Sequence, residues 1–321
     1  MLGMEAPAPF DPSVLRLYAD LRRAGLDPQR AGGWQRVRRG VWMPVVVWQD
    51  LTPEQRHAAL VHATALVCDG EGRPRHVFAA ESAAAVWGLP RVEAWPTTVR
   101  TLATSGRPRG SSGVRPLVGA EVEPVAFKGV LVTPVARTLA DLACRGSLPS
   151  AVAAADHAVR HGLCSFAELR AEADAVPHRV RGRPAARLVA ELADSDSMSV
   201  GESLSRVQMF RLGVPRPRLQ VPHHDDQGLI GVVDFEWLGV VGEFDGKLKY
   251  RVPPGASPEE AAEIVWREKK REDRLRVDSR VARWTWQVAL DRDQLGRVLA
   301  AQGVRPGPRA SWFDLGAPRS A

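Results

Sequence analysis

The stretch that decides the fold of the C-terminal part reads Leu229-Ile-Gly-Val-Val-Asp234-Phe-Glu236-Trp237-Leu-Gly239-Val-Val-Gly-Glu243-Phe-Asp245-Gly-Lys247-Leu-Lys249-Tyr250. Two runs of β-branched and aromatic residues flank a glycine, which predicts a β-hairpin turning near Leu238-Gly239. Side chains alternate between the two faces of a strand. We therefore expect Asp234, Glu243, Asp245 and Lys247 to lie on one face of this hairpin.

Several carboxylates on one face repel one another unless a cation lies between them. Oxygen ligands suit Mg²⁺ or Mn²⁺, so Asp234, Glu243 and Asp245 are candidate metal ligands. Such an ion can polarise a phosphodiester, and Lys247 is a candidate for stabilising the developing charge. The alternative is a solvent-exposed strand face whose acids pair with Lys247, Lys249 and nearby arginines.

Helices are predicted on both sides of the hairpin. The preceding one starts at Ser199 and carries Glu202, a further candidate catalytic residue, although Ser199-x-x-Glu202 is also a capping box. The following one starts at Ser257 and is strongly charged, and a strand is expected over 281–288. Its candidate DNA contacts are Arg267, Lys270, Arg271 and Arg274, although alternating charges also suit a solvated helix face.

The N-terminal stretch predicts a short helix from Pro12 to about Gly25, a basic turn and a strand-like run over 34–48. This order is the skeleton of a small winged DNA-binding unit, with Arg36, Arg38 and Arg39 as candidate DNA contacts. Between Arg22 and Val41 there is barely space for a recognition helix.

The segment in between reads as α+β, with helices over about 53–67 and 80–87, three short strands, and further helices after Pro134. A change of composition over 176–198 places the main domain boundary there. We divide the chain into a winged-helix-like segment (1–50), an α+β region (51–193), a domain with a mixed sheet flanked by helices (194–301) and a tail (302–321).

The amino-acid composition limits the classes of protein to which this chain can belong. The 321 residues carry 44 basic and 37 acidic side chains, a net charge of +7, with a pI near 9.9. A basic balance of this kind is typical of a nucleic-acid partner, but abundant Arg, Ala, Gly and Pro also follow from a GC-rich coding sequence. Three scattered cysteines predict neither a disulfide framework nor a zinc site. Without an apolar run of about 18 residues or a signal-peptide pattern, we expect a soluble cytoplasmic protein without membrane contacts.

The C-terminal hundred residues resemble the very-short-patch-repair-like endonuclease domain of the PD-(D/E)XK superfamily, which is common in actinobacteria. The matching pieces are Glu202, Val-Asp234-Phe, Glu243-Phe-Asp245-Gly, Arg271-Glu-Asp-Arg274-Leu and Trp284-Thr-Trp286. The preceding part resembles AbiEi-type antitoxin-like proteins. The matching segments are Arg38-Arg-Gly40-Val-Trp-Met-Pro44, Glu81-Ser82-Ala-Ala-Ala-Val-Trp87-Gly-Leu-Pro90 and Val132-Thr133-Pro134-Val-Ala-Arg137-Thr138-Leu-Ala-Asp141-Leu.

The resemblance implies an N-terminal winged helix that binds double-stranded DNA and a restriction-endonuclease-like domain with Mg²⁺ held by Asp234 and Glu243. The superfamily has a lysine two residues after its second acid, where this chain has Asp245. Pairing Asp234 with Asp245-Gly-Lys247 restores an acid-x-lysine triplet, and both registers stay open.

Three functions follow as hypotheses. The first is a metal-dependent DNA endonuclease. The second is a non-catalytic DNA-binding regulator or antitoxin of a type IV toxin–antitoxin-like system, with a cognate toxin as partner. The third is a structural adaptor whose basic surface reflects coding bias.

Overall fold

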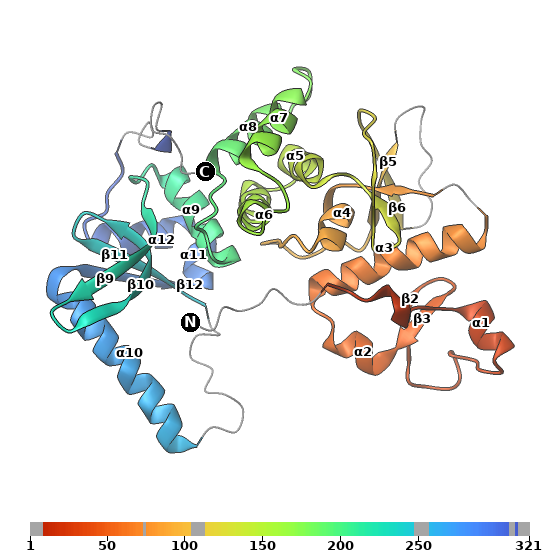
Figure 1. The fold of residues 1–321 in the computed structure, drawn as a ribbon, viewed down its shortest axis with the longest axis horizontal. Coiled ribbons are helices and arrows are strands. Elements are labelled where there is room, and N and C mark those ends of the chain that lie inside the picture. Colours follow the sequence, from red (N-terminus) through yellow and green to blue (C-terminus); the bar gives the residue numbers. More distant parts are fainter. Residues whose placement is uncertain (1–8, 73–74, 104–112, 247–256, 308–311, 314–321) are drawn as a thin grey trace. The chain divides into compact units, whose positions relative to one another are not determined.

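The computed structural model describes residues 9–72, 75–103, 113–246, 257–307 and 312–313. The chain divides into two compact units, residues 1–190 and 191–321 (Figure 1). The division lies within the last turn of helix α8 (Arg183–Leu192), three residues before the boundary predicted from composition. The architecture is α+β, with mixed sheets flanked by helices, which confirms the predicted fold class.

The first unit opens with a small antiparallel sheet in the order β1-β3-β2. Its elements are η1 (Pro12–Val14), β1 (Arg16–Leu17), α1 (Tyr18–Arg23), β2 (Trp34–Arg38), β3 (Val41–Pro44) and α2 (Val45–Asp50). The helix predicted from Pro12 is therefore shorter, because Arg16 and Leu17 pair with β3 instead. The run predicted as strand up to Trp48 turns into α2 after Pro44. Residues 24–33 form turns and bends and no second helix.

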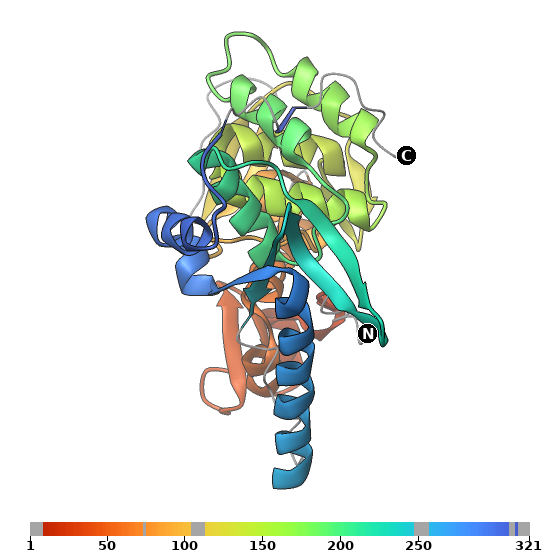
Figure 2. The ribbon, with the colours of Figure 1, turned by 90° about the vertical axis from the view of Figure 1, so that its left-hand side faces the viewer.

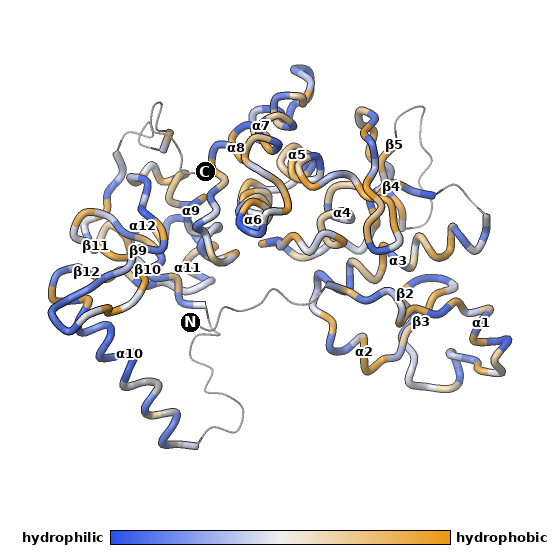
Figure 3. Tube along the Cα trace, viewed as in Figure 1, coloured by the Kyte–Doolittle hydropathy of each residue, from blue (hydrophilic) through white to orange (hydrophobic). Residues whose placement is uncertain are grey.

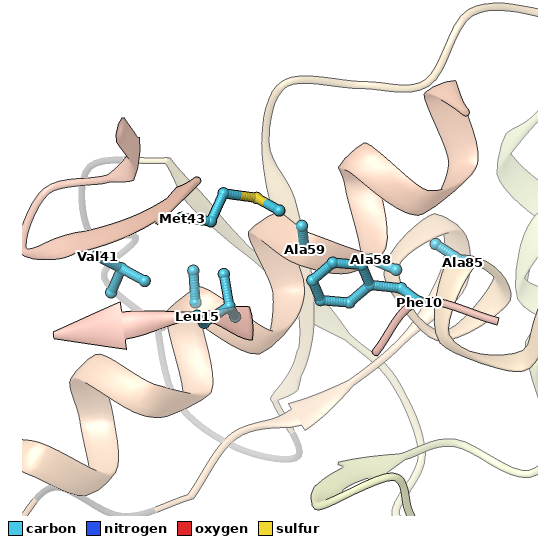
Figure 4. Packing of buried hydrophobic residues seen from close by; sticks show 8 residues of the cluster. Phe10, Leu15, Val41, Met43, Ala58, Ala59 and Ala85 are labelled. Carbon is cyan, nitrogen blue, oxygen red and sulfur yellow. The ribbon is translucent and has the colours of Figure 1, made fainter. Parts of the chain in front are cut away.

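An apolar cluster links this sheet to helix α3 (Pro53–Gly70). Val41 and Met43 of β3 are fully buried against Leu15, Phe10 and the small side chains of α3 (Figure 4). Helix α3 begins where the sequence predicts, because the Thr52 hydroxyl accepts a hydrogen bond from the Gln55 N–H and the Gln55 side chain accepts from the Thr52 N–H. The arginine-bearing hairpin β2–β3 is thus fixed to the rest of its unit.

The rest of this unit is a five-stranded mixed sheet in the order β6-β5-β4-β8-β7, packed with helices. Its strands are β4 (Val77–Phe78), β5 (Val99–Ala103), β6 (Val114–Val118), β7 (Val125–Phe127) and β8 (Val130–Val132), and its helices besides α3 and α8 are α4 (Ala80–Trp87), α5 (Val135–Arg145), α6 (Leu148–Arg160) and α7 (Phe166–Ala175). Helix α4 ends at Gly88, whose φ of +78° is the left-handed conformation that glycine adopts without strain.

A buried histidine of α3 contacts helix α4 and the segment that leads into β5. His57 Nδ1 lies 2.8 Å from the Pro96 carbonyl oxygen, and Nε2 lies 3.1 Å from the Ser82 hydroxyl. The carbonyl can only accept, so Nδ1 carries the proton and Nε2 accepts from Ser82. Burial lowers the pKa of His57 to about 4, because the charged ring would lose its hydration.

This histidine makes the stability of the first unit dependent on pH. In the unfolded chain the His57 side chain binds a proton near pH 6.5, whereas in the folded chain it does so only near pH 4. The stabilisation present above pH 6.5 is therefore lost as the pH falls. Between pH 7 and pH 5 we expect His57 to lower the free energy of unfolding by about 2 kcal/mol. Urea unfolding of wild type and His57→Gln at both pH values measures this share. An unchanged pH dependence in the variant would contradict it, and His161→Gln, an exposed histidine, is the control.

The second unit is a four-stranded sheet in the order β12-β11-β10-β9. Its elements are α9 (Val200–Leu212), β9 (Arg218–Asp225), β10 (Gly228–Trp237), β11 (Val240–Asp245), α10 (Pro258–Asp278), β12 (Arg280–Thr285), α11 (Trp286–Leu290) and α12 (Arg292–Ala301). Strands β9 to β11 are antiparallel, whereas β12 joins β11 in parallel after the crossover through α10. The predicted hairpin and its turn at Leu238-Gly239 are confirmed, and the last predicted strand ends at Thr285.

Helices α9 and α10 cover different faces of this sheet. A Cβ at Gly201 of α9 would meet the Phe244 ring at 2.0 Å, so this helix lies very close to β11. From α10, Leu275 packs on Val233, Val241 and Val281. The remainder of α10 is strongly hydrophilic (Figure 3) and extends well past the strands of its unit (Figure 2). None of the helices in the described residues combines the length and apolar character needed to cross a bilayer.

Candidate functional site

Asp234 takes part in the strand pairing through its side chain. Strand β10 pairs with β11 from Trp237↔Val240 to Phe235↔Gly242. One residue further, the Asp234 carboxylate accepts a hydrogen bond of 2.8 Å from the Phe244 N–H. Asp234 is 8% exposed, and this contact places a buried carboxylate beside the backbone that leads into Asp245.

Glu202 is connected to Asp234 through a glutamine that the sequence pattern did not single out. The Gln220 amide donates to Glu202 at 3.0 Å and lies 3.5 Å from Asp234 Oδ1. Gln220 has a φ of +50°, an unusual conformation for a residue other than glycine. Glu202 also accepts from the Ser199 hydroxyl at 2.8 Å and from the Met198 N–H at 2.9 Å. It therefore both serves the start of α9 and contacts the acid site.

Glu243 lies against guanidinium groups. Arg271 of α10 donates to Oε1 at 2.5 Å, and Arg283 of β12 donates to Oε2 at 2.9 Å. Arg283 is the residue opposite Glu243 in the parallel β11–β12 ladder, and Gly231 leaves room for Arg271, since a Cβ there would lie 2.6 Å from Nε. At 5% exposure the Glu243 charge needs compensation, which the two arginines provide.

Asp245 differs from its two neighbours in the site. Its Oδ1 atom is buried and makes no hydrogen bond within the part of the chain that the structure describes. Lys247, the other candidate of this strand, lies outside the described residues. Across the described residues, no group of three or more His, Cys, Asp and Glu side chains is arranged as a metal site. The structure thus brings Asp234 together with Glu202 through Gln220, while Glu243 is engaged by arginines.

Two of the four candidate DNA contacts of α10 join this helix to the strands of its own unit. Arg274 binds Asp225 at the end of β9 with Nε–Oδ2 at 2.7 Å, and its hydrogen bonds hold the pKa of Asp225 below the ordinary value. Arg271 contacts Glu243 as above. Arg267 pairs with Glu263 on the exposed side of the helix, and Lys270 lies 3.7 Å above the ring of Trp266.

The three N-terminal arginines line one groove. It encloses about 750 Å³ between α1 and the hairpin β2–β3, and its lining residues are Tyr18, Gln29, Arg36, Val37, Arg38, Arg39, Gly40 and Trp42. Arg36 and Arg39 are exposed, and within the described ranges neither guanidinium forms an ion pair or hydrogen bond. Arg38 is different, because it donates to the Thr64 hydroxyl, and burial lowers its pKa.

The geometry defines an α+β protein with a basic, aromatic groove in one unit and a buried acid cluster in the other. No protein-family model matches the chain. Over 222 residues it is 32% identical to the uncharacterized proteins Rv2248 and MT2308 of Mycobacterium tuberculosis, strains H37Rv and CDC 1551. The aligned segment covers 68% of this chain and 75% of each relative. The chain belongs to the same family as these mycobacterial proteins.

Proposed function

We propose that the protein associates with double-stranded DNA in the cytoplasm and that its C-terminal unit is a metal-dependent endonuclease. The observation that carries this proposal is the pair Asp234 and Asp245. The Asp234 carboxylate is hydrogen-bonded to the N–H of Phe244, the residue next to Asp245, and Asp245 Oδ1 is buried without a hydrogen bond among the described residues. A buried carboxylate oxygen is costly unless something compensates it, and a divalent cation does so.

The contacts favour one of the two registers left open by the sequence. Both oxygens of Glu243 face guanidinium groups, whereas Asp245 Oδ1 has no hydrogen bond among the described residues and can act as a metal ligand. We therefore assign Asp234 and Asp245 as the ligands of Mg²⁺ or Mn²⁺, with Lys247 completing the triplet. Glu243 then positions the end of β11 through Arg271 and Arg283, and Glu202 orients Asp234 through Gln220. A bound ion would polarise the scissile phosphate and activate a water molecule.

DNA association is supported by the N-terminal groove. Arg36 and Arg39 offer two exposed guanidinium groups beside Tyr18 and Trp42. Arginines of this kind bind phosphates, which hold a protein on DNA without specifying sequence. The absence of a helix in residues 24–33 removes the element that would read base edges in the major groove. We therefore infer contact with the DNA backbone rather than sequence recognition.

Plasmid nicking in the presence of Mg²⁺ tests the endonuclease. We expect nicking by wild type and loss of nicking to the protein-free level in Asp234→Asn, because the amide cannot supply an anionic ligand. Asp225→Asn is the matched control, since Asp225 is an aspartate of the same sheet that pairs with Arg274. Equal nicking by wild type and Asp234→Asn would refute the assignment.

The arginines at Glu243 favour a second candidate, a non-catalytic DNA-binding regulator or antitoxin that keeps the acid cluster for stability. In that case purified wild type binds duplex DNA in a salt-dependent way but leaves plasmid intact with Mg²⁺ and with Mn²⁺. A cognate toxin would then be the second partner, as the resemblance to AbiEi-type proteins implies.

A further inference from the structure

A second arginine-rich groove lies at the turn end of the C-terminal sheet. It encloses about 670 Å³, and among its lining residues are Trp237, Leu238, Arg216, Arg218, Arg280 and Arg305. Asp245 lies five residues along β11 from Val240 at this turn, a separation of roughly 16 Å at the rise of a β-strand. The groove is therefore separate from the acid cluster.

Two of the four arginines in this groove have no acidic partner among the described residues. Arg216 binds Asp194 at 2.8 Å, and Arg218 binds Glu236 at 2.8 Å. Arg280 and Arg305 are exposed and have neither an ion pair nor a side-chain hydrogen bond with any described residue. The groove thus presents two positive charges that no acid of the described chain neutralises, which is an arrangement suited to an anionic ligand.

The fold fixes the position of Arg280. Its backbone N–H donates to the Gly239 carbonyl at 3.1 Å, which anchors the residue beside the hairpin turn. Its guanidinium lies directly over Gly303, because a Cβ at that position would be 2.5 Å from Nη1. Gly303 also has a φ of +88°, which favours glycine. The backbone of Arg280 is therefore anchored at the hairpin turn, and its exposed guanidinium packs against Gly303.

The aromatic side chain of Trp237 lines the same groove as Arg280 and Arg305. The Trp237 indole N–H donates to the Pro215 carbonyl at 2.9 Å, and its ring is stacked with Phe235 at a centroid distance of 6.3 Å. Leu238 beside it is fully exposed at the tip of the turn. A rigid, half-buried indole beside guanidinium groups is the combination on which a base stacks while its phosphate is neutralised.

We propose that this groove binds one nucleotide unit, with the phosphate on Arg280 and Arg305 and the base against Trp237. The inference rests on the proposed action on DNA and deepens it, because it adds a contact in the same unit as the acid cluster. The volume suits one nucleotide rather than a long segment of duplex. We assign the occupant to a DNA strand, in which an unpaired nucleotide exposes both groups.

Fluorescence anisotropy with a labelled 12-nucleotide single strand tests this proposal. In the double variant Arg280→Gln/Arg305→Gln we expect about tenfold weaker binding and a slope of log affinity against log salt that is smaller by about 0.7, since the variant loses one phosphate contact on single-stranded DNA. Trp237→Leu should weaken binding about fivefold with an unchanged salt slope, because stacking releases no counterions. The control Arg276→Gln/Arg292→Gln removes two exposed arginines that already pair with Glu272 and Asp293.

Each outcome separates this inference from the proposed function. Equal affinity and salt slope in wild type and Arg280→Gln/Arg305→Gln would overturn the proposed nucleotide site in this groove while leaving DNA association intact. A wild type that binds neither this single strand nor a labelled duplex of the same sequence, but binds free deoxyadenosine monophosphate through Arg280 and Arg305, would support a nucleotide site and refute DNA association. A wild type that binds neither the single strand, the duplex nor the monophosphate would overturn both. Circular dichroism of every variant excludes unfolding as the cause of a loss.

Discussion

Trp284→Ala is expected to lower the free energy of unfolding of the C-terminal unit by about 4 kcal/mol, which is typical of truncating a fully buried aromatic residue. Trp284 is 2% exposed, and its ring lies 5.3 Å from that of Phe235. Its indole N–H donates to the Ser205 hydroxyl at 2.8 Å, so it joins β12 to α9. Gly242 makes room for the ring, since a Cβ there would lie 2.8 Å from it.

Urea unfolding followed by circular dichroism measures this loss, and hydrogen exchange of peptides from β10 and β11 assigns it to the C-terminal unit. Trp266→Ala is the matched control, because Trp266 is 51% exposed on α10 and its loss should change stability by less than about 1 kcal/mol. Similar losses in the two variants would contradict the proposed packing.

Glu243→Gln is expected to destabilise the same unit by about 3 kcal/mol. The amide keeps the shape of the carboxylate but removes the charge that Arg271 contacts, and it leaves Arg283 only its 3.4 Å ion pair with Glu272, in a site where the glutamate side chain is 6% exposed. Because a charged group cannot regain full hydration there, the loss exceeds that of a surface ion pair. We expect the hydrogen exchange of β11 and β12 to increase together, since Arg283 links the two strands to this acid.

The matched control is Glu263→Gln, which removes the glutamate of the Glu263–Arg267 pair on the exposed side of α10. Both side chains there are about half exposed or more, so the loss should stay below about 1 kcal/mol. Both variants are compared by urea unfolding at pH 7. Equal stability of Glu243→Gln and wild type would show that the arginines do not depend on this carboxylate.

Local signals in the sequence predicted much of the fold. Alternation and Gly239 predicted the hairpin, and capping residues such as Thr52 and Ser257 predicted where helices begin. The wrong predictions concern segments whose secondary structure depends on residues far away in the sequence. The predicted N-terminal helix begins six residues later, at Tyr18, because Arg16 and Leu17 pair with β3. The apolar run after Pro44 became α2 instead of a strand. No pattern within either segment shows these partners.

The candidate site was predictable only in part for the same reason. Alternation predicted that Asp234, Glu243 and Asp245 lie on one face of a hairpin, but it could not show that Asp234 bonds to the Phe244 backbone while Glu243 faces Arg271 and Arg283. Gln220 had no signal at all, because its role depends on an unusual backbone conformation in β9. Spacing along one strand thus predicts which acids are candidates for the site but not which residues contact them.

The crossover through α10 also sets the order in which the site can assemble during synthesis. The partners of Glu243 lie 28 and 40 residues further along the chain. While the ribosome is still adding α10, the antiparallel strands β9 to β11 are complete, yet Glu243 lacks Arg283 and β11 has no neighbour on its outer edge. Only after Thr285 has left the exit tunnel can the parallel strand dock. A nascent chain therefore carries Glu243 well before Arg283 can contact it, so a chain stopped before β12 should not form a stable sheet.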